Sequence, residues 1–142
     1  MSSLRRRVPL AAALVGTALL SFTACSDDSS TTTASSRSPA PEDVIAPAAD
    51  VASGLRRLGE VSDQIVAAGT DTTKANAAIA QLEPIWEHVE GAVRKNDLDV
   101  YVSVEEDLVL LAKAGNGDAD TAKRGGDDLR TQIDTYLASY PG

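Results

Sequence analysis

The sequence predicts an all-α protein, an up-down-up-down antiparallel four-helix bundle that follows a signal peptide and a disordered tether. Three observations lead to this prediction. From residue 42 onward, apolar side chains recur at alternating three- and four-residue steps, as they do on the buried face of a helix. No run of period-two alternation bounded by turns favours strands. Short turn sequences separate the helical stretches, so the helices can bury their apolar faces only against one another.

The N-terminus has the pattern of an export signal. Arg5, Arg6 and Arg7 precede an uncharged, mostly apolar run from Val8 to Ala24. A basic segment followed by an apolar segment and small residues is typical of a secretory signal. An uncleaved membrane helix is the alternative, but the run is barely long enough to cross about 30 Å of hydrocarbon, and it contains Pro9. We therefore predict that residues 1–24 are a lipoprotein signal peptide, with the Sec or twin-arginine route left open.

Cys25 is the single cysteine of the chain, so it has no partner for an internal disulfide. The sequence Phe22-Thr23-Ala24-Cys25 resembles the bacterial lipobox, although Phe22 is bulkier than the usual aliphatic residue. This resemblance implies acylation of Cys25, by chains such as palmitate. Each buried methylene of the acyl chains contributes about 0.8 kcal/mol to anchoring. We expect the mature protein to be lipid-anchored at the extracytoplasmic face of the cell membrane.

The mature chain is strongly acidic, because the leader removes three of the 13 basic residues and none of the 21 acidic ones. The resulting formal charge of −11 repels phosphate backbones, which argues against nucleic acid as a partner. It also gives no attraction to anionic lipid, so the acyl group is the predicted membrane contact. Cation binding, a basic protein partner and plain solubility all remain compatible with the acidic excess.

Residues 25–41 are predicted to be a tether that begins at the acylated cysteine. The stretch from Ser26 to Pro41 is rich in Ser, Thr and Pro and offers almost no side chains for a core. A flexible coil of this length has a reach on the order of 20–25 Å. The acidic bundle of residues 42–142 should therefore work close to the membrane.

The first helix is expected over residues 42–68, with Gly69 as its end. Pro47 would either kink this helix or delay its start. The second helix is expected from Asp71 or Thr72 to Lys95, with a kink or split at Pro84. The predicted apolar seam of the first helix comprises Val44, Ala48, Val51, Leu55, Leu58, Ser62 and Ile65.

Asn96 and Asp97 read as a turn and the cap of a third helix, expected over residues 98–114. Its predicted inward face comprises Leu98, Tyr101, Leu108, Val109 and Ala112. A break at residues 115–118 precedes a fourth helix that is capped by Asp118 or Asp120 and ends at Ser139. Gly125 and Gly126 weaken that helix by about 1 kcal/mol each, unless a neighbouring helix packs closely against them.

Glu105 falls near the middle of the predicted inward face of the third helix. A buried carboxylate must be protonated, hydrogen-bonded, paired with a cation or bound to metal. The hydrogen-bond donors considered are Tyr101, Tyr136 and Trp86. The alternative is that the buried face is shifted and Glu105 lies at its edge.

Glu83 and Glu90 lie beside the apolar face of the second helix, so the metal hypothesis is that they converge with Glu105 on one hard cation such as iron or calcium. The competing interpretation is a solvated face in which Glu90 pairs with Arg94. His88, the single histidine, points away from the apolar face and is predicted to lie at the surface. A di-iron centre needs paired Glu-x-x-His motifs, which the chain lacks.

The mature domain contains no nucleophile elbow, no Cys-His pair and no glycine-rich phosphate loop, so it is not predicted to be an enzyme. Residues 82–91, 96–101, 105–108 and 136–142 resemble small helical lipoproteins of high-GC Gram-positive bacteria. Some of these are similar to imelysin-type periplasmic components of iron uptake, although this chain lacks a paired histidine signature. The resemblance implies an accessory role in iron uptake.

Two hypotheses of function follow. In the first, the protein is a lipid-anchored binding or accessory module that serves a membrane permease or another envelope protein and assists cation uptake. In the second, it is an envelope interaction or structural lipoprotein without a small ligand, whose acidity only keeps it soluble.

Overall fold

The computed structural model describes residues 40–142. The predicted signal peptide, Cys25 and all of the predicted tether before Ala40 lie outside the described residues. The described residues all belong to one compact unit. The buried core of this unit lies between Ala46 and Tyr136, so the unit contains its own hydrophobic core. A fragment of residues 36–142 therefore carries the whole described core and is the domain to be used for binding and stability measurements.

The described residues are helical almost throughout and contain no strand, so the prediction of an all-α helical bundle is confirmed. Two short 3₁₀ helices, η1 (Pro41–Asp43) and η2 (Ala112–Asn116), accompany the α-helices. The α-helices within residues 40–142 are α1 (Ala48–Ala68), α2 (Thr72–Ile79), α3 (Leu82–Asn96), α4 (Leu98–Leu111) and α5 (Ala119–Ser139).

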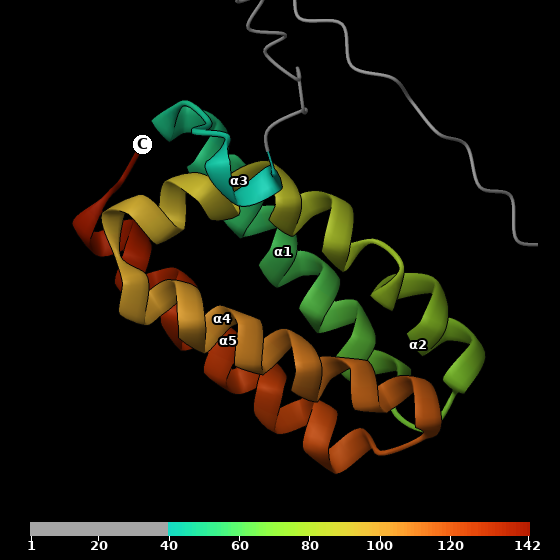
Figure 1. The fold of residues 1–142 in the computed structure, drawn as a ribbon. Helices are drawn as coiled ribbons and strands as arrows, with labels where there is room; N and C mark the ends of the chain where they lie inside the picture. The colour runs from blue at the N-terminus through green and yellow to red at the C-terminus, as the bar shows by residue number, and fades with distance from the viewer. Residues whose placement is uncertain (1–39) are drawn as a thin grey trace, which may run out of the picture. The chain divides into compact units, whose positions relative to one another are not determined.

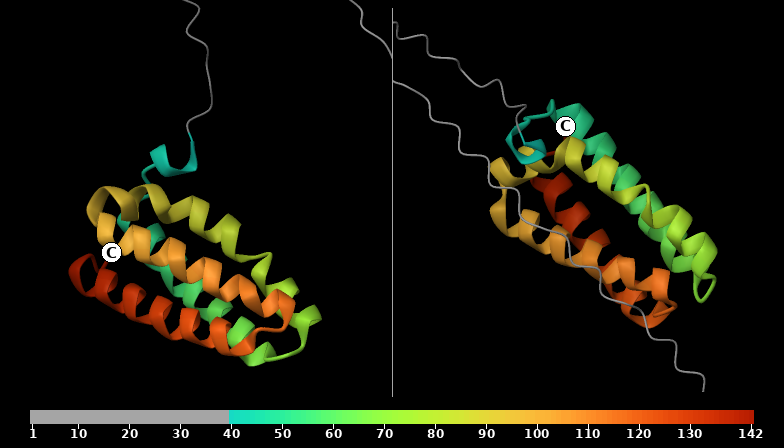
Figure 2. Two further views of the ribbon diagram at one scale, coloured as in Figure 1. Left: turned by 60° about the horizontal axis from the view of Figure 1, so that its bottom comes forward. Right: turned by 45° about the vertical axis from the view of Figure 1, so that its right-hand side comes forward.

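The longer helices enclose a common core (Figure 1). Helix α1 packs against α3 and α5, while α4 packs against the same two helices from the other side. Figure 2 shows α4 and α5 side by side in both views, connected through η2. Helix α2 covers the end of α1 and contacts η2. The side chains buried most completely at the centre are Leu55, Leu58, Val61, Ile65, Val89, Val93, Val104, Leu111, Leu129 and Tyr136.

The first α-helix begins later than the predicted residue 42. Pro47 is its N-cap residue, with φ −58°, and the helix starts at Ala48. Proline lacks an N–H and has a fixed φ, so it suits a helix start and not a helix interior. The predicted seam is buried from Val51 to Ile65, but Val44 and Ala48 at its start are exposed.

The predicted second helix is split in two, as Pro84 led us to expect. Helix α2 ends at Ile79 and α3 begins at Leu82, which places Pro84 in the first turn of α3. The first N–H groups of a helix have no intrahelical acceptor, so the missing N–H of a proline costs little there. The break thus lies just before Pro84 and not at the proline itself.

Aspartates cap three helices of the described domain, each at a position that the sequence predicted. Asp71, Asp97 and Asp118 accept hydrogen bonds from the backbone N–H groups of Lys74, Val100 and Thr121, each at 3.1 Å. The N–H and side-chain hydrogen bonds from Lys74 and Thr121 lower the pKa values of Asp71 and Asp118. Gly69, with φ 56°, ends α1 as expected.

The glycine pair of α5 lies where three helices meet. A Cβ added to Gly125 would lie 2.9 Å from the backbone oxygen of Asp107 on α4. A Cβ added to Gly126 would lie 2.7 Å from Val66 and 3.1 Å from Ser62, both on α1. Close packing against neighbouring helices therefore requires both glycines, as expected for a glycine pair inside a helix.

Candidate interaction surface on helix α4

Helix α4 is buried along a face different from the one predicted. Its buried residues are Val100, Val104, Asp107 and Leu111, at steps of four, three and four residues. Tyr101 and Leu108 are only half-buried, and Leu98, Val109 and Ala112 are exposed. The prediction that these five residues form the inward face is therefore wrong. The apolar residues of α4 occupy two sides of the helix. The side that packs against the core is the one that carries Val100, Val104 and Leu111.

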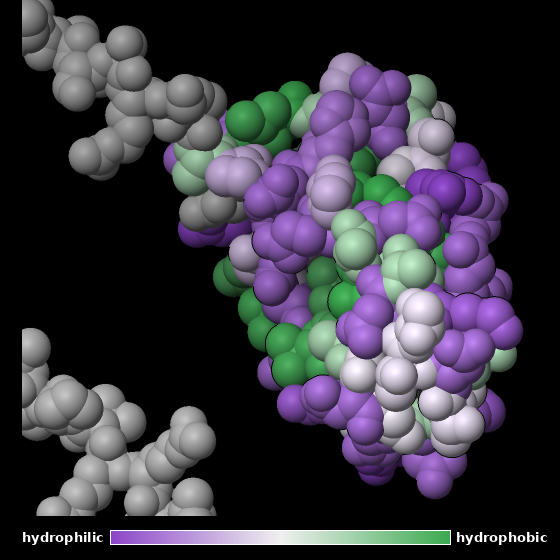
Figure 3. All heavy atoms as spheres, turned by 90° about the vertical axis from the view of Figure 1, so that its right-hand side faces the viewer, coloured by the Kyte–Doolittle hydropathy of each residue, from purple (hydrophilic) through white to green (hydrophobic). Residues whose placement is uncertain are grey.

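The outward side of α4 carries three large hydrophobic residues, which we call the α4 stripe: Leu98, Val102 and Val109. Their side chains are 58%, 46% and 59% exposed, respectively. At 100° per residue they lie within about 40° of one another, on the side of the helix opposite Asp107. Figure 3 shows one face of the domain, on which patches of hydrophobic side chains interrupt a largely hydrophilic surface. The stripe is therefore an apolar ridge with no described element covering it.

Carboxylates flank the α4 stripe. Glu105 lies on one side of it on the helical wheel, and Asp99 and Glu106 lie on the other. From Asp97 to Ala112 the chain contains five acidic residues and no basic residue. Opposite charges three or four residues apart can pair on an exposed helix face, and α4 has no basic residue to form such pairs. The outward face of α4 is thus both apolar and anionic.

The seam between α3 and α4 holds the aromatic residues closest to this face. The indole N–H of Trp86 on α3 donates a hydrogen bond to Oε1 of Glu105 at 2.5 Å. The Trp86 ring stacks on Tyr101, with 5.8 Å between ring centroids. The guanidinium of Arg94 lies 5.9 Å from the centroid of the Tyr101 ring. Glu105 is therefore half-buried and held by Trp86, one of the donors proposed from the sequence, and it lies at the edge of the buried face.

The predicted cation site does not form among the described residues. Residues 40–142 contain no group of three or more His, Cys, Asp or Glu side chains that could hold a metal ion. Glu83 is exposed near the start of α3, whereas Glu90 is 7% exposed and Glu105 points to Trp86. Glu83 and Glu90 lie on α3 and Glu105 lies on α4, and the three carboxylates do not converge as ligands. His88 is exposed, as predicted.

On α4 the buried carboxylate is Asp107, which was not among the residues expected to point inward. Its side chain is 6% exposed, and Oδ2 has no hydrogen-bond partner. Burial, together with the charges of Asp128 and Glu106, raises the pKa of Asp107 to about 6. The 4-3-4 spacing of Val100, Val104, Asp107 and Leu111 is visible in the sequence, but it is only as regular as the apolar arc on the opposite side of the helix, so spacing alone does not select Asp107.

A hollow of about 460 Å³ lies at the end of the bundle, between the segment that joins η1 to α1, the helices α1 and α3, and the C-terminal residues. Its apolar walls include Ile45, Val51 and Tyr136. Its polar groups bond to one another: the Asn96 side chain donates to the Tyr136 hydroxyl at 2.8 Å, and the Tyr140 hydroxyl donates to the Asn96 carbonyl at 2.9 Å. These hydrogen bonds fasten the C-terminus to α3.

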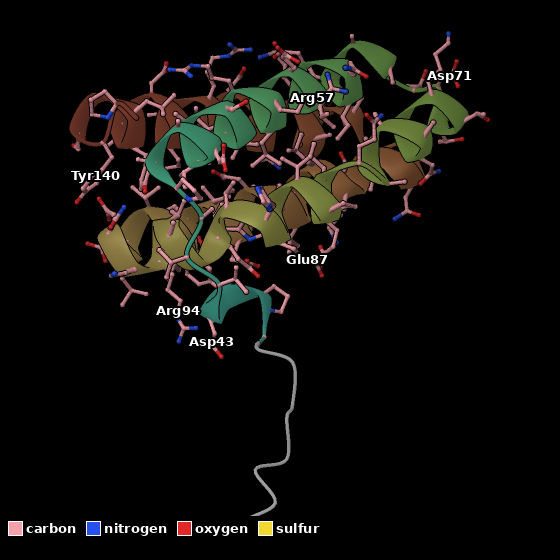
Figure 4. All side chains as sticks on the ribbon, turned by 90° about the horizontal axis from the view of Figure 1, so that it is seen from above. Asp43, Arg57, Asp71, Glu87, Arg94 and Tyr140 are labelled. Atoms are coloured by element: carbon pink, nitrogen blue, oxygen red, sulfur yellow. The ribbon has the colours of Figure 1, made fainter. Side chains whose placement is uncertain are left out.

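Figure 4 shows Arg94 of α3 and Asp43 of η1 on the same side of the domain, and Glu87 projecting away from α3.

Within residues 40–142, no helix is long and apolar enough to cross a membrane. Comparison of the chain with known protein families, with curated proteins and with solved structures finds no match.

Proposed function

We propose that the protein is a lipid-anchored accessory module of the cell envelope, whose α4 face binds a protein partner outside the cytoplasmic membrane. The observation that carries this proposal is the exposed α4 stripe. Three large hydrophobic side chains aligned on one outward helix face, away from the core, are more than scattered surface residues. A helix that is apolar on two sides is normally buried on both.

The address comes from the N-terminal pattern. Acylation at Cys25 would hold the domain beside the membrane, and the segment up to residue 41 would leave it room to reach a neighbouring envelope protein. If that neighbour is a metal permease, the assistance to cation uptake acts through contact with the permease. This form of the proposal requires no ion bound by Glu83, Glu90 and Glu105.

The address is tested with the full chain and its Cys25→Ala variant in a bacterial host that acylates lipoproteins. The unchanged chain should take up a radioactive fatty acid and sediment with membranes. The variant should accumulate as unlabelled precursor, because the acceptor thiol is gone. Labelling of the variant would overturn the lipid-anchor proposal.

The interaction is tested by photo-crosslinking in the native cell, with a photoreactive residue at position 102 on α4 or at position 135 on α5. Both positions are exposed in the structure. A defined crosslinked product should form from position 102 and not from position 135. Equal crosslinking from both positions, or none from position 102, would favour the alternative of a solvating envelope lipoprotein without a specific partner.

A further inference from the structure

We infer that the α4 stripe and its carboxylates form a docking site for a cationic amphipathic helix of the partner protein. This inference rests on the proposed function and names the chemistry of the partner. It follows from the exposed apolar residues and from the negative charges around them. The same negative charges disfavour a second copy of the chain and an anionic lipid surface.

The apolar component sets the shape of the partner. Leu98 and Val109 are 11 residues apart, so the stripe runs for about 16 Å along the helix axis. A partner helix that packs lengthwise on it needs apolar residues over about three of its own turns, at three- and four-residue steps. The stripe is a ridge between α3 and α5, so the partner would pack against α4 as an additional helix of the bundle.

The charges set the sign of the partner. Asp99, Glu105 and Glu106 border the stripe, and Glu83 and Glu87 are exposed on α3, next to the Trp86 that binds Glu105. Arg94 lies against the Tyr101 ring. Lys or Arg residues that flank an apolar stripe on the partner would meet these carboxylates, and complementary charges raise both association rate and specificity.

The same charges disfavour other occupants. In a second copy of the chain, an α4-to-α4 contact would bring the carboxylates of two faces together, and like charges across an interface are unfavourable. A lipid surface with anionic headgroups would repel the face for the same reason. The predicted partner is therefore a basic helix and neither another copy of the domain nor the bilayer.

The test measures binding of designed helical peptides to residues 36–142 by fluorescence anisotropy. One peptide of about 18 residues carries a leucine stripe flanked by lysines, and a second carries the same leucine stripe flanked by glutamates. The lysine peptide should bind at least about tenfold more tightly than the glutamate peptide, and its affinity should fall as salt concentration rises. Equal affinity of the two peptides, or absence of binding, would overturn the inference.

Substitutions locate the site. The triple variant Leu98→Ser, Val102→Ser, Val109→Ser should weaken binding of the lysine peptide by about tenfold or more. The matched control, Val44→Ser with Ile45→Ser, removes exposed hydrophobic residues elsewhere and should leave affinity unchanged. Because all five side chains are exposed, circular dichroism and urea unfolding should show the fold retained in both variants.

A second pair of variants separates the local charges from the overall acidity. Asp99→Asn with Glu106→Gln should weaken binding of the lysine peptide by about threefold to tenfold. Asp50→Asn with Asp134→Asn removes the same charge from exposed positions on α1 and α5 and should have a much smaller effect. Equal effects of the two pairs would mean that the peptide senses only net charge, which overturns a site on α4.

Analytical sedimentation tests whether a second copy of the domain occupies the α4 stripe, and vesicle binding tests whether the bilayer does. A concentration-dependent dimer that the serine triple variant abolishes would assign the stripe to a second copy and overturn the inference. Sedimentation of residues 36–142 with phospholipid vesicles would assign it to the bilayer and overturn it equally. These results are independent of Cys25 acylation, so failure here and failure of the lipid anchor are distinguishable.

Discussion

Asp107 shows how burial alters a single carboxyl group. Its neighbours on the inward face of α4 are aliphatic, and Oδ2 finds no hydrogen-bond donor. Removing a carboxylate from water disfavours its charged form, and the negative charges of Asp128 and Glu106 add to that effect. The pKa of Asp107 is therefore raised from 3.8 to about 6.

We predict that Asp107 makes the fold less stable as pH rises. The folded protein holds the Asp107 proton up to a pKa of about 6, whereas the unfolded chain releases it near 3.8. Unfolding therefore releases a proton between these values, and the free energy of unfolding falls as pH rises through that window. The Asp107→Asn variant lacks this proton release. The difference between its free energy of unfolding and that of wild type should therefore rise by about 2 kcal/mol from pH 4 to pH 7.5.

Urea unfolding of residues 36–142 at the two pH values measures this difference. Asp107→Ala is the companion variant: it removes the same titrating group but changes packing differently. Both variants should show the same change between the two pH values, whatever their absolute stability. A difference from wild type that is independent of pH would show that Asp107 titrates normally.

At the scale of the element, α4 and α5 depend on each other through Gly125. In the sequence alone, this glycine is only a residue of low helix propensity. In the folded domain, an alanine Cβ there would lie 2.6 Å from Cβ of Leu110 and 2.9 Å from the Asp107 carbonyl oxygen. The obstacle includes backbone, so α4 and α5 would have to move apart to accept even one methyl group.

We predict that Gly125→Ala lowers the free energy of unfolding by about 1–3 kcal/mol, because overpacking outweighs the gain in helix propensity. Gly59→Ala is the matched control on α1. An added Cβ at Gly59 makes one ordinary contact of 3.5 Å, with Ile133. The free energy of unfolding of Gly59→Ala should therefore rise by about 0.5–1 kcal/mol, because alanine is the better helix former. Urea denaturation of both variants tests this contrast, and stabilisation by both would contradict the tight packing of α4 on α5.

Helix α4 also shows where the periodicity of a sequence becomes ambiguous. Leu98, Tyr101, Leu108 and Val109 make one apolar arc, and Val100, Val104 and Leu111 make another. An acidic residue lies in each arc, Glu105 in the first and Asp107 in the second. The helix wheel alone gives no reason to choose between them, and the choice made from the sequence placed the wrong carboxylate in the core.

At the scale of the whole molecule, acidity opposes compactness. Residues 36–142 contain nineteen acidic and ten basic residues. The ion pairs of the described residues include Arg57 with Glu60 and Arg130 with Asp63, and their side chains are more than half exposed. Exposed pairs contribute little to stability, so repulsion among the excess carboxylates remains largely uncompensated.

We predict that the melting temperature of residues 36–142 rises when sodium chloride is increased from about 0.02 M to 0.5 M, because salt screens this repulsion. Differential scanning calorimetry at pH 7.5 measures the shift. A variant with Asp120→Asn and Asp134→Asn, both at exposed positions, should show a smaller increase. A melting temperature that falls with salt would mean that attractive pairs dominate the electrostatics.

The sequence by itself determined the helical class, the ends of most helices and the expected address at Cys25. Helix ends depend on residues a few positions apart: Pro47 and the aspartate caps start helices, and Gly69 ends one. Such interactions are local, so they can be predicted without knowing what packs where. The address rests on a linear pattern read before folding, and it stays a prediction.

Only the tertiary structure decided which side of α4 faces the core. That choice depends on the shapes of α3 and α5, and in particular on Gly125 of α5, which lets α4 approach closely. It places Asp107 inside, turns Glu105 to Trp86 and leaves the α4 stripe exposed. Two apolar arcs of similar size on one helix have similar burial energies, so the choice between them belongs to the neighbouring helices.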